Sequence, residues 1–132
     1  MKKNIYNRIV AFIAIAFSML TLVEGLQVLL GITHPDYYVL RPLLIYNVVM
    51  GFVGFIVGIT LWLNYRRGLI LTSAVTAAHV IVFLIVGLLF LSNGDVAGHS
   101  INAMIIRSTV WIVVLLVVWR TNFVNKKHSI EK

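Results

Sequence analysis

The main pattern in this chain is a series of long apolar stretches separated by short polar segments. The stretches occupy residues 9–31, 43–63, 69–91 and 99–119. About 20 largely apolar residues are enough for an α-helix to cross the hydrocarbon core of a bilayer. The pattern therefore predicts an all-α integral membrane protein, with residues 1–132 forming a single transmembrane domain as an antiparallel four-helix bundle.

The second stretch carries small residues at helical spacing. Asn47, Gly51, Gly54 and Gly58 follow each other at i, i+4, i+7 and i+11, which places them on one face of a helix. Aligned glycines allow the backbone of a neighbouring helix to approach closely. We expect this face to make the tightest helix contact in the bundle, with Asn47 at its outer end.

Polar side chains also recur on the first and third helices. On the first they follow every three residues, at Ser18, Thr21, Glu24 and Gln27. On the third they lie at Thr72, Thr76 and His79. A carboxylate within a span must be paired, protonated or hydrated. His79 lies near the membrane centre, where it either hydrogen-bonds across helices or has a functional role.

The fourth stretch carries Arg107 near its middle. An arginine at that depth costs about 2.5–3.5 kcal/mol on insertion scales, so we expect it to face inward. At a rise of 1.5 Å per residue, Glu24 and Arg107 both lie roughly 10–12 Å below the outer surface. We therefore predict a buried Glu24–Arg107 ion pair. Such a pair can also serve only to neutralise two charges or to fix helix register.

The segments that connect the apolar stretches are predicted to form turns. Residues 32–41 include Pro35, which disfavours a continuous helix, and Pro42 suits the first turn of the second helix. The N-terminal apolar run is longer than a signal-peptide core and lacks a clear cleavage motif, so we expect a retained first helix. The polar, basic segment 120–132 is expected to be poorly ordered.

Composition agrees with a membrane protein. Hydrophobic residues make up 61% of the chain and charged residues 11%, and the mean hydropathy is +0.99. These values lie outside the range of soluble globular domains. The chain has no cysteine, which excludes disulfides and thiolate metal sites.

The basic residues outside the predicted helices are concentrated at one end of the bundle, in alternate connecting segments; of the other two segments, only residues 32–41 carry a basic residue, Arg41. The others precede the first stretch, separate the second from the third, and follow the fourth: Lys2, Lys3, Arg8, Arg66, Arg67, Arg120, Lys126, Lys127 and Lys132. This distribution predicts that both termini are cytoplasmic (N-in/C-in). We expect a multi-pass protein of the bacterial cytoplasmic membrane whose basic ends contact anionic headgroups, with no nucleic-acid partner.

The predicted depths group the polar residues in the extracytoplasmic half of the bundle. Glu24 and Arg107 share one level, the two asparagines lie slightly shallower, His79 slightly deeper, and His99 near the mouth. We therefore predict one polar pocket, lined by Glu24, Asn47, His79, His99, Asn102 and Arg107.

Three functions fit this pattern. The first is binding or moving a small polar, anionic or lipid-like ligand in the predicted pocket. The second is an accessory or assembly subunit, or a homodimer, in which Gly51, Gly54 and Gly58 would face outward to bind a second membrane protein. The third is a small membrane enzyme that uses Glu24 and His79 for acid–base or metal chemistry.

Metal binding is the weaker form of the enzyme hypothesis. Carboxylate and imidazole groups are suitable ligands. However, the depths of His79 and His99 differ by about 15 Å, and Arg107 would repel a cation. We therefore predict no metal site, and the sequence identifies no cofactor.

Overall fold

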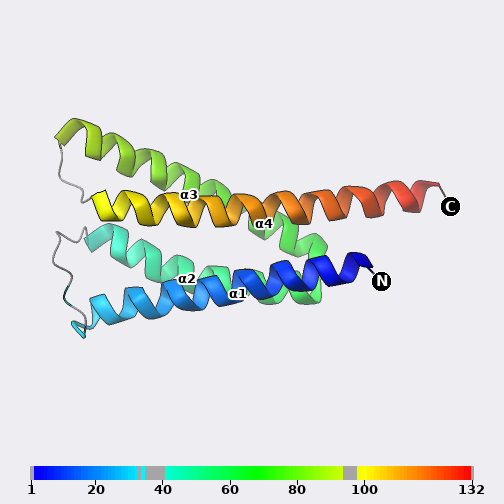
Figure 1. Cartoon of the computed structure of the whole chain (residues 1–132), viewed down its shortest axis with the longest axis horizontal. Coiled ribbons are helices and arrows are strands. Elements are labelled where there is room, and N and C mark those ends of the chain that lie inside the picture. The colour runs from blue at the N-terminus through cyan, green and yellow to red at the C-terminus, as the bar shows by residue number, and fades with distance from the viewer. Residues whose placement is uncertain (1, 33, 35–40, 94–97, 132) are drawn as a thin grey trace.

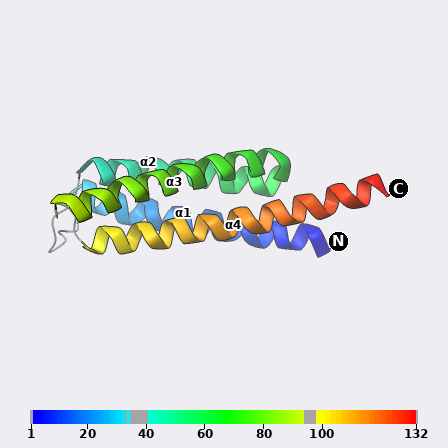
Figure 2. The same ribbon diagram turned by 90° about the horizontal axis from the view of Figure 1, so that it is seen from above.

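The computed structural model describes residues 2–32, 34, 41–93 and 98–131. The described residues form four helices, which are α1 (Lys2–Leu29), α2 (Arg41–Leu63), α3 (Tyr65–Asn93) and α4 (Gly98–Ile130). Each helix contains a segment long and apolar enough to cross a membrane. The predicted all-α, multi-pass membrane bundle is therefore confirmed (Figures 1 and 2).

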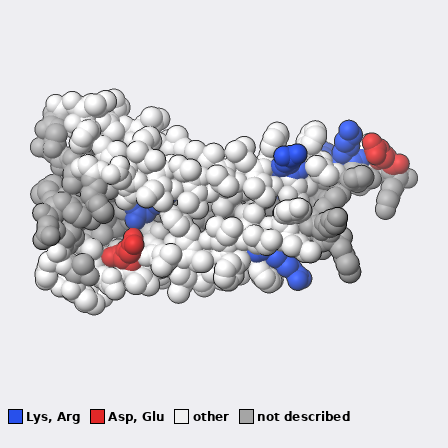
Figure 3. Space-filling view, viewed as in Figure 1, with Lys and Arg blue, Asp and Glu red and all other residues white. Residues whose placement is uncertain are grey.

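The helices form a closed antiparallel ring. α1 packs most extensively on α2, and α3 packs on α4, while α2 also contacts α3 and α4 contacts α1. The α1–α4 seam is the least extensive of these four contacts. Both termini lie at the same end (Figure 1), where most of the lysines and arginines visible in Figure 3 gather. This arrangement agrees with the charge distribution that predicted both termini on one side.

Local signals set the helix ends. After α1, Gly31 has a φ of +76°, a conformation that favours glycine. The amide of Ile32 donates to the carbonyl of Gln27 at 2.9 Å, which completes a glycine-based C-cap. At the other end of the bundle, the side-chain oxygen of Asn64 accepts the amides of Arg66 and Arg67 at 3.2 and 3.4 Å. Asn64 is therefore the N-cap of α3 and the only residue between α2 and α3.

The tail expected to be poorly ordered is helical instead. α4 continues to Ile130. Within this extension, the ring of Trp119 lies 6.1 Å from that of Phe123, one helical turn later. The Thr121 hydroxyl donates to the carbonyl of Val117 at 2.8 Å. These local contacts between residues four apart support the helix beyond the predicted span.

The glycine face of α2 packs against α1, as its predicted role in close contact required. An added Cβ on Gly51 would lie 3.2 Å from the Leu22 Cα, and one on Gly58 would lie 3.1 Å from the Ile15 backbone nitrogen. Gly51, Gly54 and Gly58 are all buried. The face is therefore used within the chain and does not point outward, contrary to the expectation of the accessory-subunit hypothesis.

Two apolar clusters form the core. The larger fills the half toward the termini, and its buried members are Val10, Ala11, Ala14, Val57, Leu61, Val75, Trp111, Val114 and Val118. The smaller consists of Leu43, Val86 and Met104 and lies toward the opposite end. Buried polar side chains such as Ser18, Thr21 and His79 lie between the clusters. The core is therefore apolar toward both ends of the bundle, with a polar layer between the two clusters.

Replacing Gly58 with alanine should destabilise the bundle. The new methyl group would press on the backbone of α1, and overpacking of this kind typically costs about 1–3 kcal/mol. Gly87→Ala is the matched control, because a Cβ there meets nothing within 4 Å. Alanine is the better helix former, so this control should be neutral or stabilising. Reversible unfolding in mixed micelles measures both changes; equal effects would contradict the packing role of Gly58.

Candidate functional site

His79 lies at the centre of an aromatic cluster contributed by three helices. Its side chain is only 2% exposed. Its Nδ1 atom shares a hydrogen bond of 3.2 Å with the Tyr46 hydroxyl of α2, and the two rings meet edge to face. On the other side, the indole of Trp111 from α4 stacks on the imidazole with ring centres 6.1 Å apart. His79 is therefore held in one orientation by both neighbouring helices.

Two hydroxyl groups join α3 to α4 beside this cluster. Thr76 Oγ1 donates to the carbonyl of Trp111 at 3.2 Å, and Ser108 Oγ donates to the carbonyl of His79 at 3.5 Å. Both hydroxyls are buried. In a bilayer, cross-helix hydrogen bonds take over part of the role that the hydrophobic effect has in water. These two bonds fix the register that brings Trp111 onto His79.

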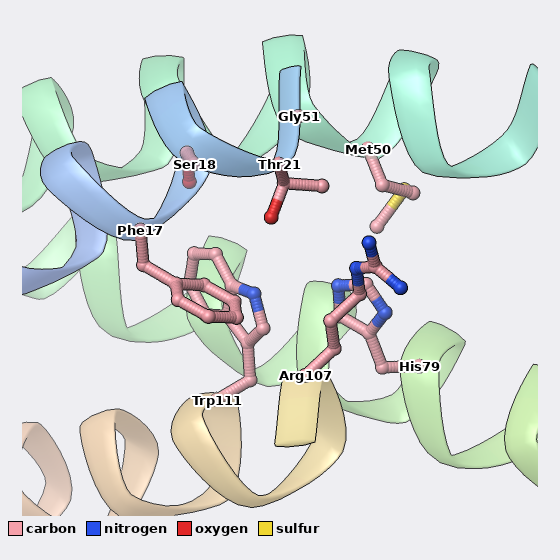
Figure 4. A pocket seen from close by; sticks show the side chains of 8 residues that line it. All are labelled: Phe17, Ser18, Thr21, Met50, Gly51, His79, Arg107 and Trp111. Atoms are coloured by element: carbon pink, nitrogen blue, oxygen red, sulfur yellow. The ribbon is translucent and has the colours of Figure 1, made fainter. Parts of the chain in front are cut away.

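A small cavity lies beside the cluster, and all four helices contribute to its lining. The lining residues are Phe17, Ser18, Thr21, Met50, Gly51, His79, Arg107 and Trp111 (Figure 4). Its volume of about 10 Å³ is just at the limit for a single water molecule. The centre of the bundle at this level is therefore filled by side chains and has no space for a larger ligand.

A larger hollow lies in the seam between α1 and α4, and we call it the α1–α4 groove. α1 contributes Phe17, Leu20, Thr21 and Glu24, and α4 contributes Asn102, Ala103, Ile106 and Arg107. Its volume is about 310 Å³, at the lower end of the range for small-molecule sites. The groove occupies the seam where neighbouring helices make their least extensive contact.

Arg107 connects the two hollows. Together with Phe17 and Thr21 it lines both the cavity and the α1–α4 groove. Its side chain is half-buried, and Figure 4 shows it extending from α4 into the cavity beside His79. Arg107 therefore lies between the central cavity and the α1–α4 groove.

The predicted site residues divide between these places. Glu24 and Asn102 are exposed and line the α1–α4 groove, whereas His79 lines the cavity. Asn47 is buried in α2 and lines neither hollow. Its amide oxygen has no hydrogen-bond partner among the described residues. His99 belongs to the first turn of α4, and its side chain lies outside the described residues. The structure therefore brings together Glu24, Asn102 and Arg107, with His79 behind Arg107.

The predicted buried ion pair is not observed. The structure shows no salt bridge between Glu24 and Arg107, and Glu24 is exposed rather than buried. The cause is the geometry of the polar ridge on α1. Residues three apart are rotated by about 60° from being in line, because a helix has 3.6 residues per turn. Ser18 and Thr21 face the interior, so Glu24 is turned toward the α4 seam.

Sequence reasoning missed Tyr46 as a site residue. Its hydroxyl is the partner of the His79 ring, but a tyrosine in an apolar stretch gives no sign of which helix its hydroxyl will face. The hypothesis that Glu24 and His79 act together also loses support, because they line different hollows. Among the described residues, no three histidine, aspartate or glutamate side chains form a group able to hold a metal ion.

Thr76→Val should destabilise the bundle, because it removes a hydroxyl that bonds across helices. Such bonds in membrane proteins average about 0.6 kcal/mol and reach about 1.7 kcal/mol. Thr60→Val is the matched control, since the Thr60 hydroxyl donates only within its own helix, to the carbonyl of Ile56. The control should change the free energy of unfolding by less than about 0.5 kcal/mol. Equal losses would show that the α3–α4 bond contributes nothing specific.

The chain was compared with models of protein families, with curated proteins and with solved structures, and no match was found in any of the three comparisons.

Proposed function

We propose that this small multi-pass membrane protein binds a zwitterionic amphiphile, taking its headgroup into the α1–α4 groove from the surrounding bilayer. The observation that carries the proposal is the lining of the groove. An acid and a cation, Glu24 and Arg107, share a surface whose other residues are mostly apolar. Ligand sites commonly combine an apolar wall with a few polar groups that set orientation.

The two charges suit a headgroup that carries both signs. The guanidinium of Arg107 has five N–H donors in a planar fork, which matches phosphate and leaves donors for its other contacts. The carboxylate of Glu24 would receive an ammonium group. Figure 3 shows a cationic and an acidic side chain next to each other on one face of the bundle, away from its ends. Electrostatic attraction at such a site is stronger than in water, because the surrounding dielectric constant is lower.

The apolar residues of the groove suit the rest of an amphiphile. Leu20 and Ile106 are 63% and 57% exposed and would contact acyl chains at the membrane-facing side of the groove. Glu24 precedes the end of α1 by five residues and Arg107 follows the start of α4 by nine, so they lie about 8 and 14 Å below those ends. By the positive-inside rule, this depth belongs to the outer leaflet of a cytoplasmic membrane.

The predicted Glu24–Arg107 ion pair has a place in this proposal. In the absence of a ligand, a change of rotamer could bring the two groups together, so that each neutralises the other. A zwitterionic headgroup would replace this contact with two of its own. The ligand would then bind at two charges that the groove otherwise has to neutralise internally.

Two variants test the proposal with the purified protein in detergent and defined lipids. Native mass spectrometry should show that Arg107→Gln lowers retention of phosphatidylethanolamine about tenfold, which corresponds to about 1.4 kcal/mol. Glu24→Gln should lower retention of phosphatidylethanolamine but not of the anionic phosphatidylglycerol, because it removes only the partner of the ammonium group. Glu131→Gln makes the same chemical change in the C-terminal extension and should have no effect.

Two results would contradict this function. In the first, Arg107→Gln retains phosphatidylethanolamine as well as the parent protein does. In the second, Glu24→Gln lowers the retention of both lipids equally, which would mean that the carboxylate does not distinguish a zwitterionic headgroup from an anionic one.

A further inference from the structure

A second polar hollow lies at the opposite end of the bundle, where α1 and α2 meet the start of α3, and we call it the terminal hollow. Its volume is about 210 Å³, and its lining consists of Asn7, Arg8, Leu61, Trp62, Leu63 and Tyr65. It shares no residue with the α1–α4 groove. The proposed amphiphile site therefore does not account for it.

One cation in the terminal hollow is held in position. The guanidinium carbon of Arg8 lies 5.6 Å from the ring centre of Trp62. A cation above an indole face is attracted by the negative face of the ring. The planar guanidinium of arginine can stack on a ring and still direct N–H donors outward to an anion. This contact joins α1 to α2 and keeps the charge of Arg8 at the hollow.

The terminal hollow is also lined by Asn7, which has a buried amide. Asn7 is 8% exposed, and its amide oxygen is buried without a hydrogen-bond partner among the described residues. A buried polar group left without a partner typically costs about 1–3 kcal/mol. Besides this oxygen, the amide of Asn7 carries an NH₂ group, which has two donors.

The lining as a whole selects for an acceptor with negative charge. The Arg8 guanidinium, the Asn7 amide and the Tyr65 hydroxyl can all donate, and none of the described residues that line the hollow is acidic. Phosphate oxygens accept several hydrogen bonds at once and pair well with arginine. The chemistry therefore matches a phosphate group.

The position of the hollow indicates where that phosphate would come from. Trp62 and Tyr65 lie where tryptophan and tyrosine are enriched, at the end of membrane-spanning helices. Leu63 is 79% exposed and offers an apolar surface next to the polar lining. A lipid could thus place its phosphate in the hollow and its acyl chains along the outside of α2.

We propose that the terminal hollow is a specific binding site for the phosphate of an anionic lipid headgroup, in the leaflet on the side of the two termini. The site goes beyond the proposed amphiphile binding, since it uses other residues in the other leaflet. It also differs from general attraction between a basic protein end and anionic lipid, because it depends on an uncharged buried amide.

The test is native mass spectrometry of the full chain in detergent, titrated with phosphatidylglycerol. Arg8→Gln and Asn7→Leu should each weaken lipid retention about tenfold, equivalent to about 1.4 kcal/mol. Arg66→Gln is the matched control, because it removes the same charge at the same end from an exposed residue that does not line the hollow. It should change retention less than twofold. In an Arg107→Gln background, which disables the α1–α4 groove, phosphatidylcholine has no net charge for the terminal hollow to bind and should be retained at least tenfold less than phosphatidylglycerol.

Asn7→Leu also separates binding from folding. A residue with only a structural role would lower the melting temperature when replaced. By contrast, the oxygen of this buried amide has no hydrogen-bond partner among the described residues, so replacing the amide with an apolar group of similar shape should be neutral or stabilising. We therefore expect weaker lipid retention with an unchanged or higher melting temperature in lipid-free detergent.

Several results would overturn the site. Equal losses for Arg66→Gln and Arg8→Gln would reduce the binding to general electrostatic attraction. Unchanged retention in Asn7→Leu, or a lower melting temperature for it, would remove the role of the amide. Displacement of the lipid by millimolar inorganic phosphate would show a free-phosphate site and overturn the assignment to a lipid headgroup. Failure of these variants leaves the test at Glu24 and Arg107 unaffected, because the sites share no residue.

Discussion

The close contact between the glycine face of α2 and the backbone of α1 fixes much of the remaining arrangement. In a bilayer, apolar side chains gain little by leaving lipid for a neighbouring helix, so close packing and hydrogen bonds decide which helices associate. Gly51 and Gly58 bring α2 within contact distance of Leu22 and Ile15 on α1. This contact uses one face of α1 and sets its rotation. The rotation in turn directs Ser18 and Thr21 inward and Glu24 toward α4.

The extensive contact between α1 and α2 contrasts with the sparse contact between α1 and α4. Because α1 is held on α2 and α3 is held on α4, the bundle consists of two tight hairpins, and the α1–α4 seam between them closes least. The α1–α4 groove forms there. A polar site in such a seam faces lipid from the side, so the proposed amphiphile would reach it without crossing the core. The cavity at the bundle centre has space for no more than about one water molecule.

The polar layer between the two apolar clusters is held by hydrogen bonds between helices. Tyr46, His79 and Trp111 come from three different helices and form one cluster. The Thr76 and Ser108 hydroxyls donate to backbone carbonyls across the α3–α4 contact. Arg107 extends from this layer to the α1–α4 groove. Arg107 therefore lies next to a hydrogen-bonded layer, which would help to orient the proposed headgroup.

The sequence alone determined the fold class and the number of spans, because these follow from stretch length. It also placed Gly51, Gly54 and Gly58 on one face of α2, because that follows from the helical repeat, but only the structure showed that this face is buried. The sequence also placed Glu24, Asn102 and Arg107 in the same half of the bundle, since depth depends only on the rise per residue. Only the tertiary structure decided which of these side chains share a hollow. That choice depends on the rotation of each helix about its axis, which is set by packing against its neighbours. For this reason Glu24 faces the seam and not the centre of the bundle, Asn47 lines neither hollow, and Tyr46 became the partner of His79 without any signal in the sequence.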